Sequence, residues 1–555
     1  MQRIYLRSIL LIGSLIFSPS IAQHHYWVIF TDKDNVAFNP YTYFDARTIQ
    51  KRINRGIPIV EFTDFPVRVD YIENIKSITG EIHTVSRWVN GVSVSAGKKK
   101  LDQIARLAYV EKIIPIEMYS TSAGIPFKSI ISRCDEDLRK RQFESMGGVF
   151  FENLAIDGKG VRIAVFDNGF SDVDKSPVFE HLRNENRIIA TWDFVKNREF
   201  VYSYRFHGTS VLTCIAGKLD DKKFGLATGA EFLLARTEIS REVFSEEENW
   251  LAAMEWADKN GADIINSSLG YTHHRYRQKQ MDGKSTLVSR AASMAAAKGI
   301  LVVNAAGNDG SDFWRVIAAP ADADSILSVG GINPETGHIS SFSSLGPTFD
   351  GRMKPNVCAF GTVVTSNALE IKSSSGTSFA APLVAGFAAC VMQMNPEWSN
   401  IKTLEEIQKS GHLYPYFDYA HGFGIPQAAY FTGEKNQVKP TFSFLAGNDS
   451  VRIVFTAKSE EGVMDEIEMH KEDEVEISEG INAKMNIQLK TDRYTMDDDF
   501  LYFNISGENE KDILKRYAVV KIRKNTNYFS IPLNEIGNAS LRVFYKGYFS
   551  NFQVD

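Results

Sequence analysis

Between about residues 145 and 432 the sequence alternates apolar runs with stretches of helical periodicity, and this alternation restricts the possible folds most strongly. Residues 161–166 and 300–303 are almost wholly apolar, which is typical of strands buried on both faces of a parallel sheet. Residues 246–260 and 289–298 have helical periodicity, and a glycine follows each of them. The pattern predicts an α/β domain over 145–432, with a parallel sheet and helices on both of its faces.

The segments on either side of this domain have different patterns of apolar and polar residues. Residues 26–116 combine strand-like runs with one helical stretch, so we expect a small α+β unit that ends in a strand at 110–116. Residues 121–144 form a polar linker. After residue 433, apolar and polar residues alternate, as at 485–489 and 541–545, which predicts an all-β, sandwich-like domain over 433–555.

The N-terminus has the features of an export signal. Arg3 and Arg7 precede an apolar run at 9–17, and small residues follow it, so we predict a signal peptide over residues 1–22. Nine residues rise only about 14 Å as a helix, against about 30 Å for a bilayer core, so cleavage is favoured over a membrane anchor. No other stretch approaches the ~20 apolar residues of a span. The expected location is the periplasm or the medium.

Composition narrows the function classes. The chain has 62 basic and 68 acidic residues and a net charge of -6, which gives no electrostatic case for nucleic acid or an anionic membrane as the main partner. No C-x-x-C pair or His-rich cluster suggests zinc. The four cysteines are widely spread, so we expect burial rather than disulfides: Cys134, Cys214, Cys358 and Cys390.

Two residues of catalytic type lie at suggestive places in the predicted α/β domain. Asp167 follows the buried strand 161–166, and Gly169 allows the chain to turn at once. His207 opens an apolar, helix-like run, a position that would hold an imidazole rigidly as a general base. Taken singly, Asp167 could equally cap a turn, and His207 could be a structural histidine.

The strongest local signal is the run Ser-Ser-Gly-Thr-Ser-Phe-Ala-Ala-Pro over residues 374–382. Ser378 lies at the start of a helix, where free N–H groups and the helix dipole can stabilise an oxyanion beside the hydroxyl. Asn308 comes just after the predicted strand 300–303, so its amide could donate to the same oxyanion. The alternative for Asn308 is a simple Asn-Asp-Gly turn.

These segments together resemble the subtilisin family of serine peptidases, in which Asp, His and Ser follow one another in this order. The resemblance covers roughly residues 157–425, and residues 248–271 are similar to an exported subgroup of Bacteroidetes-type bacteria. Asn168 and Asn304 depart from the usual family pattern. The resemblance also implies the substrate-binding residues of two pocket walls: Ser268, Leu269, Gly270, Ala305, Ala306 and Gly307.

The resemblance implies a secreted or periplasmic serine endopeptidase that needs no cofactor for catalysis. Ser378 would be the nucleophile, His207 the general base and acid, and Asp167 its orienting partner, with Asn308 in the oxyanion hole. Structural calcium is possible, but its ligands are unknown; for Asp322 and Asp324 we prefer a role as loop caps. The two rival functions are hydrolysis of another acyl bond and binding by an inactive enzyme core.

Residues 23–120 resemble the family's inhibitor-like propeptide. As an intramolecular inhibitor, this unit would lay the tail after its last strand along residues 268–270, adding a strand to a sheet edge. Self-cleavage is expected between about Glu117 and Lys128, where the chain is polar. The alternative is a permanent accessory domain that is never cut. The predicted partners are therefore protein or peptide substrates and the chain's own propeptide.

Overall fold

A computed structural model describes residues 24–116, 136–239, 245–273, 275–367, 370–432, 439–456, 477–479, 500–507, 516–522 and 526–553. Within these ranges the chain divides into two compact units. Residues 24–36 and 65–116 form the first unit, and residues 37–64 join everything after residue 117 in the second. The predicted signal peptide and the expected self-cleavage segment lie outside the described residues.

The first unit is a small α+β structure, as its sequence pattern predicts. Its antiparallel sheet has the order β2 (Thr84–Ser86), β3 (Gly91–Ala96), β1 (His24–Phe30) and β4 (Val110–Ile116). Two helices accompany the sheet, α3 (Val69–Thr79) and α4 (Lys98–Ile104). Apolar side chains from the strands and helices share one core, which includes Val28, Val92, Ile75 and Ile104.

The segment 37–64 differs from the expectation that residues 23–120 form one unit. It contains α1 (Pro40–Tyr43), α2 (Ala46–Asn54) and a 3-10 turn at Phe62–Asp64, and its contacts place it in the second unit. Asn39 and Asp45 cap the two helices, because each side chain accepts a backbone N–H two residues further on. Nothing in its apolar pattern distinguishes this helical segment from the rest of an α+β unit.

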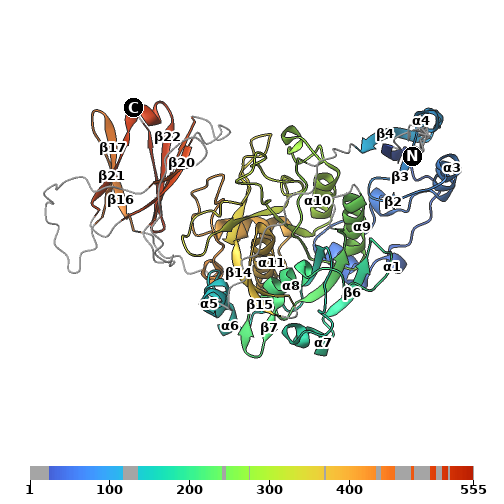
Figure 1. The fold of residues 1–555 in the computed structure, drawn as a ribbon, viewed down its shortest axis with the longest axis horizontal. Helices are drawn as coiled ribbons and strands as arrows, with labels where there is room; N and C mark the ends of the chain where they lie inside the picture. Colours follow the sequence, from blue (N-terminus) through green and yellow to red (C-terminus); the bar gives the residue numbers. More distant parts are fainter. Residues whose placement is uncertain are drawn as a thin grey trace, which may run out of the picture. The chain divides into compact units, whose positions relative to one another are not determined.

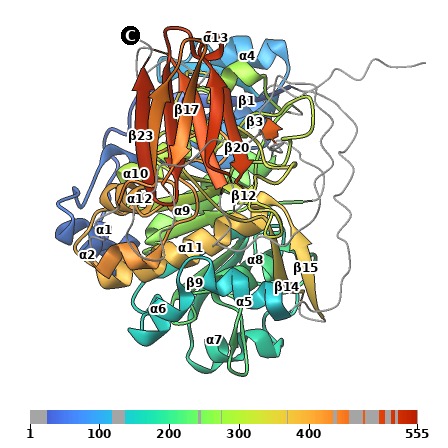
Figure 2. The same cartoon turned by 90° about the vertical axis from the view of Figure 1, so that its left-hand side faces the viewer.

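The second unit is built on a seven-stranded parallel sheet with helices on both faces, which confirms the predicted α/β fold (Figures 1 and 2). The strand order is β13-β12-β11-β10-β5-β9-β6. The strands are β5 (Arg162–Asp167), β6 (Ile188–Asp193), β9 (Glu231–Arg236), β10 (Ile264–Ser267), β11 (Leu301–Ala305), β12 (Leu327–Ile332) and β13 (Val357–Phe360).

Helices α9 (Ser245–Lys259) and α10 (Leu287–Ala297) pack against each other, and so do α8 (His207–Ala216) and α11 (Thr377–Met394). The remaining α-helices and hairpins of this region are α5 (Glu136–Glu144), α6 (Gly148–Asn153), α7 (Glu180–Asn184), α12 (Asn400–Lys409), the short hairpin β7 (Lys218–Leu219) and β8 (Lys222–Lys223), and the hairpin β14 (Thr362–Ser366) and β15 (Ile371–Ser375). The second hairpin leads directly into α11.

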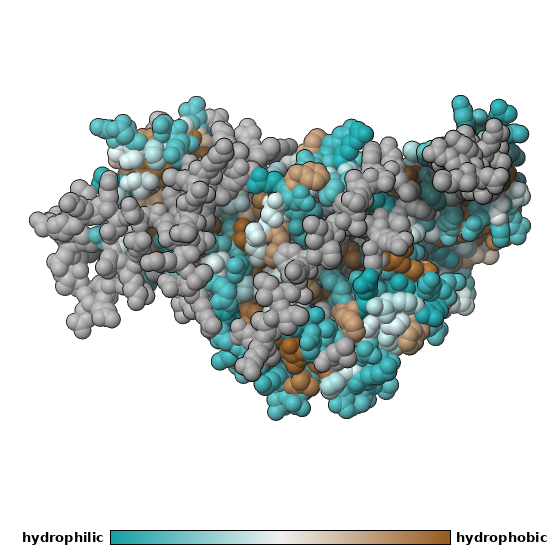
Figure 3. Space-filling model, in the orientation of Figure 1, coloured by the Kyte–Doolittle hydropathy of each residue, from teal (hydrophilic) through white to brown (hydrophobic). Residues whose placement is uncertain are grey.

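Helix α11 is the central helix of this domain. Every residue from Thr377 to Met392 is buried, and a Cβ on Gly386 would lie 3.1 Å from the Ile215 carbonyl oxygen of α8. By length and composition α11 is also apolar enough to cross a membrane, but it is mostly buried inside the domain. Its hydrophobicity is therefore that of a core helix. On the face drawn in Figure 3, hydrophobic residues of the described ranges form small patches among hydrophilic ones.

The C-terminal region contains two antiparallel sheets, in line with the predicted sandwich. One has the order β16 (Phe442–Ala446), β17 (Ser450–Phe455), β21 (Tyr528–Pro532). The other has the order β18 (Ile477–Glu479), β20 (Arg516–Lys521), β19 (Phe500–Ser506), β22 (Ser540–Tyr545), β23 (Tyr548–Gln553), and the short helix α13 (Leu533–Ile536) follows β21. Side chains of both sheets form one core, such as Ile453 and Val543. The predicted strand at 485–489 lies outside the described residues.

Candidate active site

Asp167 is the last residue of β5, at the carboxyl edge of the parallel sheet. Its side chain is fully buried, and one carboxylate oxygen accepts the backbone N–H of Asn168 at 2.8 Å. Its carbonyl oxygen accepts the N–H of Thr237, which follows the neighbouring strand β9. These contacts fix the carboxylate at the edge where functional groups of parallel sheets gather.

His207 begins α8, and its imidazole faces Asp167. The ring nitrogen Nδ1 lies 2.9 Å from each carboxylate oxygen of Asp167, while a third of the side chain stays exposed. The close approach depends on Gly208, because a Cβ there would lie 2.4 Å from the Gly169 carbonyl oxygen. Gly208 is a residue that the sequence reasoning did not single out, although it stands directly beside the histidine.

Ser378 is the second residue of α11, and Gly376 immediately before the helix has a φ of 145°. The Ser378 hydroxyl donates to the carbonyl oxygen of Ser268 at 3.1 Å, and the Ser268 hydroxyl donates to the Ser378 carbonyl oxygen at 2.8 Å. Ser378 thus lies at the N-terminus of α11 and is hydrogen-bonded to Ser268, which directly follows β10. The ring of Phe379 lies 5.4 Å from the His207 ring, centroid to centroid, so α11 also approaches the histidine.

The side chain of Asn308 is oriented by Thr377, the residue before the serine. Its Oδ1 accepts two hydrogen bonds of 2.9 Å, one from the Thr377 backbone N–H and one from the Thr377 hydroxyl. The Thr377 hydroxyl also lies 3.1 Å from the Gly307 carbonyl oxygen. With Oδ1 occupied in this way, the Asn308 amide group is the part left to donate. Sequence reasoning missed Thr377, which lies inside the string it quoted around Ser378.

The two predicted walls of the substrate pocket lie next to each other. Ser268 to Gly270 follow β10, and Ala305 to Gly307 follow the adjacent strand β11. Ala318 contacts both segments, since a Cβ on Gly270 would lie 3.0 Å, and one on Gly307 3.2 Å, from the Ala318 methyl group. Glycine at positions 270 and 307 therefore suits the close approach of these segments to the chain around Ala318.

Asn304, a departure from the family pattern, connects these two walls. Its side chain is fully buried, and Nδ2 donates to the carbonyl oxygen of Leu269 and to that of Ala305, each at 2.9 Å. The Asn304 amide therefore holds the two walls of the pocket in a fixed position relative to each other. A small aliphatic side chain at this position would leave the Leu269 carbonyl without this donor.

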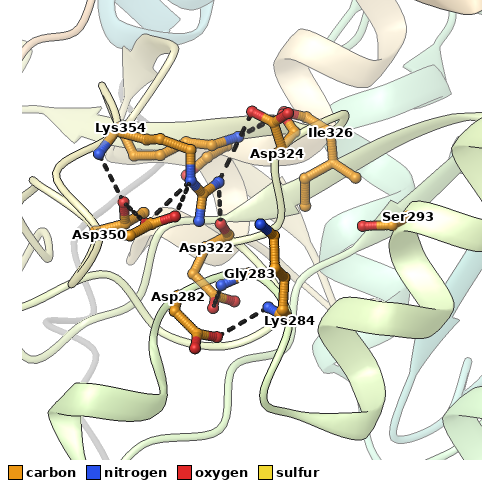
Figure 4. Close-up of polar contacts among 12 residues, drawn as sticks. Asp282, Gly283, Lys284, Ser293, Asp322, Asp324, Ile326, Asp350 and Lys354 are labelled. Atoms are coloured by element: carbon orange, nitrogen blue, oxygen red, sulfur yellow. Dashed lines mark hydrogen bonds and ion pairs between the residues drawn. The ribbon is translucent and has the colours of Figure 1, made fainter.

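The cluster around Asp322 and Asp324 does not fit a calcium ion (Figure 4). The two carboxylate oxygens of Asp322 accept the Ser289 hydroxyl at 2.5 Å and the Gly283 N–H at 2.7 Å. The Asp324 carboxylate lies 3.8 Å from Arg352, whose guanidinium also donates to the Asp322 carbonyl oxygen at 2.7 Å. Both carboxylate oxygens of Asp322 are thus already paired with groups of the protein, and the exposed Asp324 carboxylate faces the positive charge of Arg352.

The ammonium group of Lys354 completes this cluster. It is almost fully buried and donates to the carbonyl oxygen of Ile326 at 2.7 Å and to Oδ1 of Asn356 at 3.0 Å. Burial lowers the pKa of Lys354 to about 7. Across the described ranges, no other group of three or more His, Cys, Asp and Glu side chains is placed to hold a metal ion either.

Three of the four cysteines are described, and all three are free and buried, as the sequence predicts: Cys214, Cys358 and Cys390. Burial raises the pKa of the Cys214 and Cys390 thiols far above their ordinary value, so neither is a reactive thiolate. Cys134 lies outside the described residues.

Family models match two parts of the chain. Residues 158–424 match the subtilase family, Peptidase S8, and residues 25–125 match the Peptidase S8 propeptide domain of Bacteroidota. The chain is 28% identical to serine protease AprX of Bacillus subtilis over 287 residues, which cover 46% of this chain and 62% of AprX. It is 28% identical to subtilisin DY of Bacillus licheniformis over 275 residues, which cover 49% of this chain and 91% of that protein.

A solved structure supports the fold. The epidermin leader peptide processing serine protease of Staphylococcus aureus superposes with a TM-score of 0.51 at 15% identity, and the match covers 74% of this chain and all of the other. At this identity the likeness concerns the fold alone. The match extends beyond the 267 residues of a peptidase domain and thus includes flanking parts of the chain.

Proposed function

Because residues 158–424 belong to the subtilase family of serine peptidases, we propose that this chain is an exported endopeptidase whose reaction passes through an acyl-enzyme on Ser378. The observation that carries the proposal is the pairing of the buried Asp167 carboxylate with His207 Nδ1 at 2.9 Å, at the sheet edge where Ser378 begins α11. Titration with a fluorophosphonate, followed by comparison of peptide and ester turnover, tests the proposal against esterase activity and against an inactive core.

In the proposed reaction the Ser378 hydroxyl attacks the carbonyl carbon of the peptide, and its proton passes to Nε2 of His207. His207 then gives this proton to the leaving amine. A water molecule attacks the acyl-enzyme in the second step, where His207 removes a proton from the water and returns it to the Ser378 oxygen. Asp167 accepts the hydrogen bond from Nδ1–H, which holds the required tautomer and stabilises the imidazolium. The hydroxyl leaves its present acceptor, the Ser268 carbonyl oxygen, when it turns toward the histidine.

The negative charge of the tetrahedral intermediate needs donors that are already oriented. The Asn308 amide and the backbone N–H of Ser378 at the start of α11 are the two groups we propose for this role. Thr377 acts as a positioning residue, since it fixes Oδ1 of Asn308 and therefore the direction of the amide hydrogens. Donors held in this way need no reorganisation when the charge develops.

The peptide substrate is expected to bind along residues 268–270, after β10. An extended peptide can add a strand to such an edge through backbone hydrogen bonds, which suits proteins and peptides better than small esters. Between Ser268–Gly270 and Ala305–Gly307 we place the pocket for the side chain that precedes the scissile bond. The buried Ala318 methyl group, in contact with both segments, would set how large a side chain this pocket accepts.

The pH profile follows from the environment of His207. Burial opposes the charged form, but the Asp167 carboxylate and its hydrogen bond favour that form more strongly, so the pKa of His207 lies above its ordinary value of 6.5. A general base must be neutral, so kcat/KM is expected to rise with pH to a plateau, with a midpoint above 6.5. The rate should fall about tenfold per pH unit on the acid side.

The measurement is kcat/KM for a peptide substrate across the pH range, with tryptophan fluorescence recorded at each pH as the control for folding. A midpoint below 6.5 in the folded enzyme would contradict the assignment of His207 as a base paired with an ionised Asp167.

We further propose that residues 23–120 act as a removable propeptide, supported by the match of residues 25–125 to a propeptide domain of this family. The chain 23–555 is expected to cut itself between about residues 117 and 128, whereas Ser378→Ala stays at full length. Intact mass and N-terminal sequencing of both proteins measure this. A wild-type chain that hydrolyses peptides yet stays uncut would instead indicate a permanent accessory domain. Trimming of Ser378→Ala at the same point would point to a contaminating peptidase.

Export is the location we propose, either to the periplasm or to the medium. It is supported by the N-terminal sequence pattern and by the family of the propeptide domain. Expression of the full chain with its own N-terminus, followed by fractionation and N-terminal sequencing, tests whether cleavage follows residue 22.

A further inference from the structure

Residues 37–64 contact the peptidase domain at a place far from its catalytic residues. Several of their hydrogen bonds go to backbone carbonyl groups at or just beyond the C-terminal ends of α9 and α10, where helix carbonyl groups lack a partner inside the helix. These contacts are Asp45 N to Lys259 O at 2.9 Å, Thr48 Oγ1 to Asp258 O at 2.8 Å, Lys51 Nζ to Ala262 O, and Arg55 Nη1 to Gly299 O at 2.6 Å.

A chain of buried charges reinforces this contact. Arg52 Nη2 lies 2.9 Å from Asp258, and Arg52 Nη1 lies 2.6 Å from Asp64, whose other oxygen lies 2.8 Å from the ammonium of Lys298. Two of these residues belong to segment 37–64 and two to the peptidase domain, and all four side chains are at most 2% exposed. Opposite charges alternate along the chain, so each charge has a partner of the other sign.

The same segment reaches the amino-terminal edge of the parallel sheet. Arg47 contacts the carboxylate of Asp263, directly before β10, and Arg162, the first residue of β5, lies 3.4 Å from Asp45. Asp167 is at the other end of β5, five residues along from Arg162. At ~3.3 Å per residue, the segment therefore lies roughly 17 Å, the length of β5, from Asp167.

We propose that residues 37–64 are an anchor that holds the propeptide on the peptidase domain independently of any contact at the active site. The anchor binds the amino-terminal edge of the sheet and the ends of α9 and α10, so cleavage near residues 117–128 leaves all of its contacts intact. Loss of the anchor contacts is therefore expected to speed dissociation of the cut N-terminal fragment. The inference rests on the proposed role of residues 23–120 as a removable propeptide.

The charges make the anchor specific for this domain. A buried ion pair contributes little by comparison with apolar packing, but removal of one partner leaves an uncompensated buried charge and is strongly destabilising. Arg52 is the most sensitive position, because its guanidinium serves two carboxylates and packs over the Phe44 ring at 4.4 Å. Gln50 lies on the same helix but is exposed and donates only to Asn54, so it provides a matched control.

The test uses the chain 23–555 with Ser378→Ala and with a recognition site for a sequence-specific protease placed within residues 121–127. After cutting, dissociation of the N-terminal fragment is followed by size exclusion and native mass spectrometry. No activity of the chain is needed, so failure of the proposed peptidase reaction would not affect this result. We expect the fragment to stay bound, Arg52→Leu to release it at least about 30-fold faster, and Gln50→Leu to behave as the parent.

Two outcomes would overturn the anchor: immediate release from the cut parent, or equal retention by the parent and Arg52→Leu. If Arg52→Leu does not fold, as judged by circular dichroism before cutting, Thr48→Val decides the question. This change keeps the side-chain volume and removes the buried hydroxyl that donates to Asp258 O. Release several-fold faster than the parent supports the anchor, and release at the parent's rate contradicts it.

Discussion

Ser378→Ala is expected to lower kcat for peptide hydrolysis by about 10⁶-fold, as loss of the nucleophile does in subtilisin. The variant removes the attacking oxygen and leaves the helix start, the Asn308 amide and the Asp167–His207 pair in place. In the folded state the hydroxyl donates only to the Ser268 carbonyl oxygen, so the free energy of unfolding should change by no more than about 1 kcal/mol.

The measurement is steady-state turnover of a peptide substrate by the variant after its N-terminal region has been removed with an added protease. This step matters because an unprocessed variant could be inactive only because its propeptide still occupies the substrate site. Thermal unfolding of both proteins controls for stability, and fluorophosphonate labelling should be lost together with activity. Activity within tenfold of the wild type would refute Ser378 as the nucleophile.

Asn308→Ala is expected to lower kcat by about 10²- to 10³-fold with a much smaller change in KM. Loss of the equivalent donor in subtilisin has this magnitude, which corresponds to about 2.7–4 kcal/mol. The amide is proposed to bind charge that exists only in the transition state, so its loss should spare binding of the substrate. Its carbonyl group, which accepts from Thr377, would be lost in the same variant.

Asn304→Ala is the matched control, because Asn304 is also an asparagine near the end of β11 but donates to the Leu269 and Ala305 carbonyl oxygens. We expect it to act mainly on KM by disturbing a substrate wall. If Asn308→Ala altered KM alone, or if the two variants had the same kinetic pattern, the oxyanion role of Asn308 would be wrong.

The sequence alone was sufficient to predict the α/β architecture and to identify the candidate triad. Parallel strands buried on both faces require continuous apolar runs, so β5 and β11 could be located to within two residues. The catalytic residue types follow such strands or begin helices, and their order along the chain matches a known family. The strand 110–116 was located equally well, because an apolar run followed by polar linker residues marks its end.

Other features were decided by neighbours distant in sequence. The apolar stretch 377–394 was not counted as long enough for a membrane span, yet it forms one long helix, and its surroundings make it a core helix. The sequence left two roles open for Asp322 and Asp324, as calcium ligands or as loop caps. The structure shows that Arg352 and Lys354, about 30 residues further on, donate to the carbonyl oxygens of the same loop.

By itself, then, the sequence identified the residues proposed to supply the chemistry, because a nucleophile, a base and a carboxylate are properties of residue type and local setting. Only the tertiary structure decided how they are oriented and what surrounds them. Thr377 directs Asn308 across 69 residues, and Arg52 meets Asp258 across 206. Such hydrogen bonds and buried charge pairs join segments that local periodicity treats as independent, so no pattern along the chain predicts them.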